Sequence, residues 1–116
     1  MSIPQNDWLE AQVAVLGSVL LDEQWAGLVV SRTAPENWCD TYRPVFEVIR
    51  AKYTAGETID PVTVLENMKQ NGYYDETLSR GYVLQLMDTT PTAANVKEYI
   101  AIIRDKTLLR RVAEAA

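Results

Sequence analysis

The sequence predicts an all-α fold, a single-domain bundle of about six helices, and three observations lead to that prediction. Apolar residues recur at spacings of three and four along most of the chain, which is the periodicity of one helix face. Pro, Gly, Asn and Asp fall between these stretches, where turns are expected. No stretch alternates apolar and polar residues for long enough to indicate a strand. With 116 residues, 47% hydrophobic and 23% charged, the chain has the length and composition of one globular domain.

The first helix is expected to begin at Asp7, because Asp7 followed by Glu10 has the pattern of a capping box. Its apolar face is predicted to hold residues spaced by four and three, namely Leu9, Val13, Leu16 and Leu20. Asp22 is a suitable N-cap for a second, shorter helix. The apolar residues of that helix are Trp25, Leu28 and Val29.

A single turn and a third helix are predicted next. Residues 35–37 (Pro-Glu-Asn) are expected to form the turn and to present Trp38. The helix spans roughly residues 42–55, and its inward residues are predicted to be Val45, Phe46, Ile49 and Tyr53. Pro44 fits only in the first turn of this helix, and Gly56 follows its end as a left-handed cap.

Three further helices complete the predicted bundle. Asp60 followed by Pro61 is a start signal, because an N-cap carboxylate precedes a Pro whose missing N–H costs nothing there. The inward residues of this fourth helix are predicted to be Val62, Leu65 and Met68, and residues 71–72 (Asn-Gly) end it. A fifth helix is expected over residues 78–88. A sixth begins near residues 92–95 and places one apolar stripe inward: Val96, Ile100 and Ile103.

The last helical pattern has no termination signal. From residue 96 to residue 116 it contains no Gly, Asn or Pro, and it ends in Ala-Glu-Ala-Ala, which favours helix. We therefore expect the chain to be the front part of a longer protein.

The residue types needed for most kinds of catalysis are absent. Without His, neither a Ser-His-Asp nor a Cys-His arrangement is possible, and zinc loses its commonest ligand. No Gly-rich phosphate-binding loop is present, and the net charge of −5 opposes a duplex-DNA-binding surface. We expect no catalytic, cofactor or metal site in this chain. The lone Cys39, the lack of a signal peptide and the short apolar runs favour a cytoplasmic protein without a membrane span.

The C-terminal half of the last helix is the candidate interaction surface. Cations and apolar residues alternate there, and the candidate interface consists of Arg104, Lys106, Leu108, Leu109, Arg111 and Val112. One interpretation is that these cations only offset the negative end of the helix dipole on a solvated face. The other is that the apolar side packs against a partner or against sequence not included here.

Four segments together resemble DnaB-type replicative DNA helicases. Residues 9–22 read LEAQVAVLGSVLLD and are similar to that family's opening helix, usually E-A-E-Q-x-V-L-G-x-x-L-L-D. Residues 37–46 resemble its F-Y-x-x-x-H-R-x-I-F stretch, and residues 56–60 match its G-x-x-I-D turn. Residues 90–104 resemble T-P-S-A-A-N…Y…I-V-R. The segments occur in the family's order and cover nearly the whole chain.

The chain departs from the family pattern at two places. Residues 12–13 are Gln-Val where the family usually has Glu-Gln, and Tyr42 stands where it commonly has His. Neither position is catalytic in the family pattern, so the departures bear on interface details and not on the fold.

The resemblance implies an architecture and a set of partners. In that family, a small helical globule precedes a long helical hairpin, and these N-terminal domains pair into a trimer-of-dimers collar on a hexameric ring. The collar binds the helicase-binding domain of primase and shapes the channel for single-stranded DNA. A helicase loader is a further partner to be expected from the resemblance. Residues 1–95 then correspond to the globule and residues 96–116 to the first arm of a truncated hairpin. ATP and Mg²⁺ would belong to a RecA-like motor domain, absent here, of an ATP-dependent 5′–3′ DNA helicase.

Two hypotheses from different classes follow. The first is a non-catalytic oligomerisation and primase-interaction domain of a replicative hexameric helicase. The alternative is a stand-alone, phage-type helical adaptor that binds primase or helicase. Under the first hypothesis we expect the isolated chain to be monomeric or weakly dimeric, without ATPase activity and without binding to duplex DNA.

Overall fold

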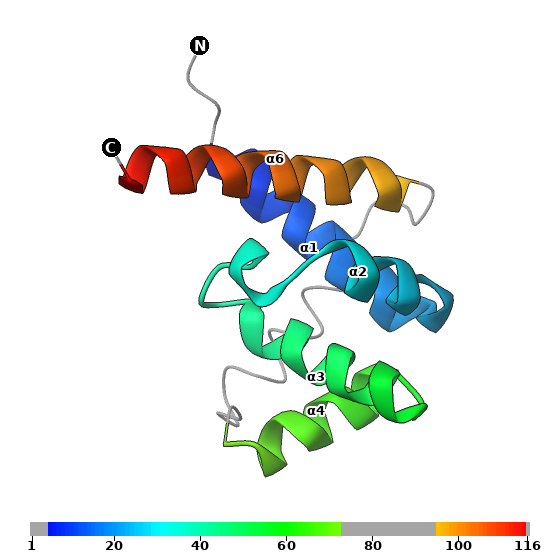
Figure 1. The fold of residues 1–116 in the computed structure, drawn as a ribbon. Coiled ribbons are helices and arrows are strands. Elements are labelled where there is room, and N and C mark those ends of the chain that lie inside the picture. The colour runs from blue at the N-terminus through cyan, green and yellow to red at the C-terminus, as the bar shows by residue number, and fades with distance from the viewer. Residues whose placement is uncertain (1–4, 73–94, 116) are drawn as a thin grey trace.

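The computed structural model describes residues 5–72 and 95–115, which form five α-helices and two 3₁₀ turns and contain no strand (Figure 1). Side chains are described for residues 8–72 and 95–111. The elements are α1 (Gln5–Leu21), η1 (Glu23–Trp25), α2 (Ala26–Arg32), η2 (Pro35–Asn37), α3 (Arg43–Ala55), α4 (Pro61–Gln70) and α6 (Val96–Ala115). The predicted all-α fold is confirmed. The helix predicted over residues 78–88 lies outside the described residues.

Helices α1 and α6 come from opposite ends of the chain and pack against each other, with α3 and α4 below them in Figure 1. The predicted stripe of α6 is confirmed, because Val96, Ile100 and Ile103 are all buried in one core shared with α1. Deeper in this core the rings of Trp38 and Phe46 stack with centroids 5.1 Å apart. The first half of α6 therefore contributes to the common core, while a domain boundary at residue 95 stays a prediction.

The start of α1 differs from the prediction. The helix begins at Gln5, so Asp7 lies within its first turns and is not the N-cap. An acidic residue is still favourable there, because the N-terminal end of a helix carries partial positive charge. Of the predicted face, Leu16 and Leu20 are buried but Leu9 and Val13 are only partly so. The buried surface of α1 is wider than one stripe and includes Ala11, Gln12, Ala14, Val15, Ser18 and Val19.

The single turn predicted at residues 35–37 is confirmed, whereas the helix predicted after Asp22 begins with a separate 3₁₀ turn. The Asp22 side chain accepts a hydrogen bond from the Gln24 backbone N–H at 3.2 Å and so caps η1, which leads directly into α2. Turn η2 at Pro35–Asn37 delivers Trp38 into the core, where its indole N–H donates to Thr33 Oγ1 at 3.3 Å.

Helix α3 follows the predicted boundaries but not the whole predicted face. Pro44 lies in its first turn, and Gly56 ends it with a left-handed φ of 71°. Tyr53 is 49% exposed, so its assignment to the core was wrong. The ring instead lies across α2, where its Oη would be 2.9 Å from a Cβ added to Gly27. The neighbouring Lys52 takes the buried position.

Helix α4 begins and ends as predicted, with a different buried face. The Asp60 carboxylate accepts from the Thr63 N–H at 2.8 Å, Pro61 is the first helical residue, and the helix closes at Asn71. Val62 is 76% exposed, so its inward assignment was wrong; Val64 and Met68 are the buried pair, with Leu65 packed beside them. Sequence spacing alone did not decide whether Val62 or Val64 faces inward, because α4 is short and packs mainly on α3. Within the described residues, no helix is long and apolar enough to span a bilayer.

Candidate functional site

A buried hydroxyl ties the candidate helix to the rest of the fold. Thr107 lies in α6, is 5% exposed, and accepts a hydrogen bond from the indole N–H of Trp8 in α1 at 3.1 Å. Its Oγ1 also lies 2.7 Å from the carbonyl oxygen of Ile103 and 3.2 Å from that of Asn37, either of which can accept its proton. Three elements, α1, η2 and α6, therefore meet at this one oxygen atom. The second half of α6 is held in a defined position.

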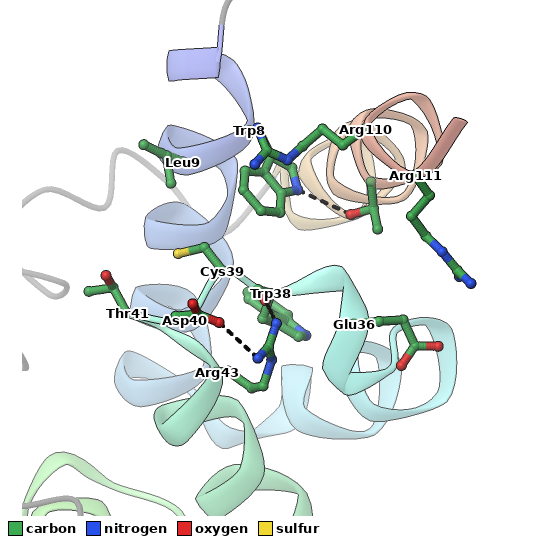
Figure 2. Close-up of a pocket in the computed structure, with 11 residues that line it drawn as sticks. Trp8, Leu9, Glu36, Trp38, Cys39, Asp40, Thr41, Arg43, Arg110 and Arg111 are labelled. Carbon is green, nitrogen blue, oxygen red and sulfur yellow. Dashed lines mark hydrogen bonds and ion pairs between the residues drawn. The ribbon is translucent and has the colours of Figure 1, made fainter. Parts of the chain in front are cut away.

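Arg110 covers the tryptophan that makes this contact. Its guanidinium carbon lies 4.4 Å from the centroid of the Trp8 ring, which is a cation–π geometry (Figure 2). Trp8 is only 6% exposed. Arg110 is thus engaged within the domain, whereas Arg111 in Figure 2 extends from a different side of α6.

Arg43 holds the segment that faces this end of α6. Its Nε donates to the Pro35 carbonyl at 3.0 Å, its Nη2 to the Trp38 carbonyl at 2.8 Å, and its Nη1 to Asp40 at 2.9 Å. The Gln12 side chain adds a fourth restraint by accepting from the Cys39 N–H at 3.0 Å. The arginine of the 37–46 motif therefore has a structural role, since its guanidinium fixes the loop after η2.

Two hollows flank the line where α6 meets η2. The first, of about 690 Å³, opens between α1, the loop after η2 and α6; it is lined by Trp8, Leu9, Glu36, Trp38, Cys39, Asp40, Thr41, Arg43, Thr107, Arg110 and Arg111. The second, of about 540 Å³, opens between α2, η2 and α6; it is lined by Ser31, Arg32, Thr33, Ala34, Asn37, Ala101, Arg104, Asp105, Thr107, Leu108 and Arg111. Thr107 and Arg111 border both hollows. We call the second the α2–α6 hollow.

The structure separates the predicted interface residues onto two flanks of α6. Arg104, Leu108 and Arg111 are spaced by four and three, share one flank, and all line the α2–α6 hollow. Lys106 and Leu109 share the other flank, beyond the buried line of Ile103 and Thr107. The side chain of Val112 lies outside the described residues. Leu108 is 63% exposed and Leu109 47% exposed, so each flank presents one large apolar residue to solvent.

Sequence reasoning missed two residues of this region. Thr107 continues the buried stripe four residues after Ile103, and that spacing could have marked it as an anchor. Arg32 belongs to α2, and no local pattern connects it to a helix more than sixty residues away. Only the tertiary structure places Arg32 in the lining of the same hollow as Arg104 and Arg111.

Among the described residues, no cluster of His, Cys, Asp or Glu could hold a metal ion. One perturbed group lies near the first hollow: burial, and secondarily the neighbouring Cys39, raises the pKa of Tyr42 above its usual value.

The comparisons with known proteins agree with the motifs. A model of the family described as "DnaB-like helicase N terminal domain" matches residues 4–105. The chain is 36% identical to "Replicative DNA helicase DnaB" of Mycobacterium leprae, covering 97% of this chain and 18% of that protein. It is 34% identical to the protein of the same name from Geobacillus stearothermophilus, covering 97% of this chain and 25% of that protein.

A solved structure supports the same relationship in three dimensions. The crystal structure of the N-terminal domain of DnaB helicase from Mycobacterium tuberculosis superposes with a TM-score of 0.86 at 34% identity. The match covers 92% of this chain and 78% of that one. The chain spans a quarter or less of the length of the two helicases above. Sequence motifs, helix order and tertiary structure converge, and the chain belongs to the family of DnaB-like helicase N-terminal domains.

Proposed function

We propose that this chain is the oligomerisation and primase-interaction domain of a replicative hexameric DNA helicase and performs no chemistry itself. Its relatives are replicative DNA helicases, and it corresponds to a small part of their length. The observation that carries the proposal is the rigid, exposed second half of α6. Two large apolar side chains, Leu108 and Leu109, are presented to solvent on a helix that Thr107 and Trp8 hold in place.

We assign self-association to the flank of α6 that carries Leu109. Tyr99 and Ile102 are only partly buried and lie on the same side, so this flank continues an apolar surface along the helix. A helix face of this kind is stabilised when a second apolar face covers it. Pairing of two copies, or of this helix with a following one, would bury it.

ATP hydrolysis belongs to another part of the helicase under this proposal. The motor domain would bind ATP and Mg²⁺, whereas this chain needs no cofactor. Its partners would be further copies of itself, the helicase-binding domain of primase and a helicase loader, all in the cytoplasm. Single-stranded DNA would pass through the assembled ring without a duplex-binding surface on this domain.

The test measures two interactions of the purified chain. Sedimentation gives its self-association constant, and calorimetry gives its affinity for the helicase-binding domain of the primase from the same organism. Leu109→Asp is expected to weaken self-association, because it places a charge in the apolar contact. Leu21→Asp is the matched control, since Leu21 is 56% exposed but lies at the end of α1. Absence of any primase binding and of any Leu109-dependent association would contradict the proposal.

A further inference from the structure

The α2–α6 hollow collects positive charge on a chain that is acidic as a whole. The net charge is −5, yet Arg32, Arg104 and Arg111 line this hollow, and among its described lining residues only Asp105 is acidic. Within the described residues, none of the three guanidinium groups forms an ion pair. Arg43 and Arg50 differ, since each is paired with a neighbouring carboxylate.

An apolar side chain lies among these cations. Leu108 follows Arg104 by four residues and precedes Arg111 by three, so the order along this flank of α6 is cation, leucine, cation. The flank is already ordered, because the buried Thr107 beside it bonds to Trp8 and to η2. Binding of a ligand here would therefore not be weakened by a loss of conformational entropy in this helix.

We infer that the α2–α6 hollow binds an acidic amphipathic segment of a partner protein, with carboxylates on Arg32, Arg104 and Arg111 and an apolar side chain on Leu108. The inference rests on the proposed function and names the chemistry of the partner at one flank of the same helix. Guanidinium groups pair with carboxylates through two parallel hydrogen bonds. The leucine between the cations favours a protein segment over a nucleic-acid backbone, which would leave Leu108 uncovered. The chain's negative charge also repels nucleic acid at longer range.

The experiment uses three probes in fluorescence anisotropy with the whole chain. They are a designed helical peptide of Glu and Leu, its counterpart with Lys for Glu, and a single-stranded oligonucleotide. The double variant Arg104→Glu/Arg111→Glu is expected to raise the Kd of the acidic peptide at least about tenfold, and Arg32→Glu several-fold, because each puts a carboxylate against a carboxylate. The matched control Lys69→Glu/Lys106→Glu makes the same charge change away from the hollow, on α4 and on the other flank of α6, and is expected to change Kd less than about twofold. Circular dichroism confirms that each variant is folded.

Equal losses in the control and the Arg104/Arg111 variant would overturn the inference, because binding would then depend on charge alone. Tighter binding of the oligonucleotide than of the acidic peptide, lost in the Arg104/Arg111 variant, would also overturn it. The helicase-binding domain of primase is titrated in parallel as a separate measurement. Suppose that the primase domain binds the unaltered chain and all variants equally, and that the Kd of the acidic peptide does not change in the arginine variants. This inference then fails, while the proposed function stands. If the primase domain binds none of them, the proposed function fails and the peptide titrations still decide the site.

Discussion

The hydrogen bond between Trp8 and Thr107 gives the sharpest quantitative prediction. Thr107→Val keeps the side-chain shape but removes the oxygen that accepts the indole proton of Trp8 at 3.1 Å (Figure 2). Both side chains are nearly inaccessible, at 6% and 5% exposure, so water cannot readily replace the lost acceptor. An orphaned buried donor costs about 1–3 kcal/mol, and we expect Thr107→Val to lower the free energy of unfolding by that amount. For a domain of this size, the melting temperature would fall by roughly 4 °C or more per kcal/mol.

A double-mutant cycle isolates that hydrogen bond from other effects of the substitution. Trp8→Phe removes the indole donor as well as ring volume, so in its presence Thr107→Val no longer orphans an N–H. The two changes together should therefore destabilise by about 1 kcal/mol less than the sum of the single changes. Urea unfolding followed by circular dichroism measures each free energy. Thr54→Val is the control, because Thr54 is exposed on α3, and it should change stability by less than about 0.5 kcal/mol. Strict additivity in the cycle, or a Thr107→Val effect no larger than the control, would refute the reasoning.

Three further predictions concern the turns and caps. Arg43→Lys should lower the free energy of unfolding by about 1–2 kcal/mol in urea denaturation, since an ammonium cannot reach two carbonyls and Asp40 at once; an unchanged midpoint would contradict the structural role. Gly56→Ala should lower the free energy of unfolding by about 1 kcal/mol, because φ is 71° at this position. Crowding is not the cause, since no described residue other than the chain neighbours comes within 4 Å of the added Cβ. Melting curves check this prediction. The hydrogen bond from the Thr63 backbone N–H is the main cause that lowers the pKa of Asp60 in the folded chain. The ionised carboxylate therefore stabilises the fold at pH values above its unfolded pKa. This stabilisation is lost as the pH falls through the folded pKa. Below about pH 4, the free energy of unfolding of Asp60→Ala should therefore decrease less steeply with falling pH than that of the unaltered chain. An equally steep decrease in the two proteins would contradict this prediction.

Local chemistry explains which parts of the fold were predictable. Asp60 with Pro61 starts α4, Gly56 ends α3, and Pro35 opens η2, because each residue acts on backbone groups only a few positions away. A cap or a left-handed turn needs no information about the rest of the molecule. The apolar stripe of α6 was predictable for a similar reason, since a long helix with one consistent spacing has only one possible inward face.

Burial on the short helices depended on what covers them. Val62 and Val64 differ by two positions on α4, and either could have faced inward until the position of α3 decided for Val64. Tyr53 has the spacing of a core residue but lies across Gly27 of α2, because a missing Cβ there leaves room for its ring. Helical spacing shows which residues of one helix share a face. Whether that face is buried depends on the neighbouring helix that packs against it.

The sequence by itself determined most of the helices and the caps at Asp22, Gly56 and Asp60, the absence of residues for His-dependent catalysis, and the motifs of a DnaB-type domain, because all of these are properties of residue identity and short spacing. It also placed cations and leucines together near the end of the last helix. Helical spacing alone separates Arg104, Leu108 and Arg111 from Leu109 on α6. Only the tertiary structure placed Arg32 of α2 in the lining of the same hollow as those three residues. The physical reason is the packing of α6 across the fold, which its buried stripe and the hydrogen bonds of Thr107 to α1 and η2 hold in place. Contacts between residues so distant in the chain have no local signal.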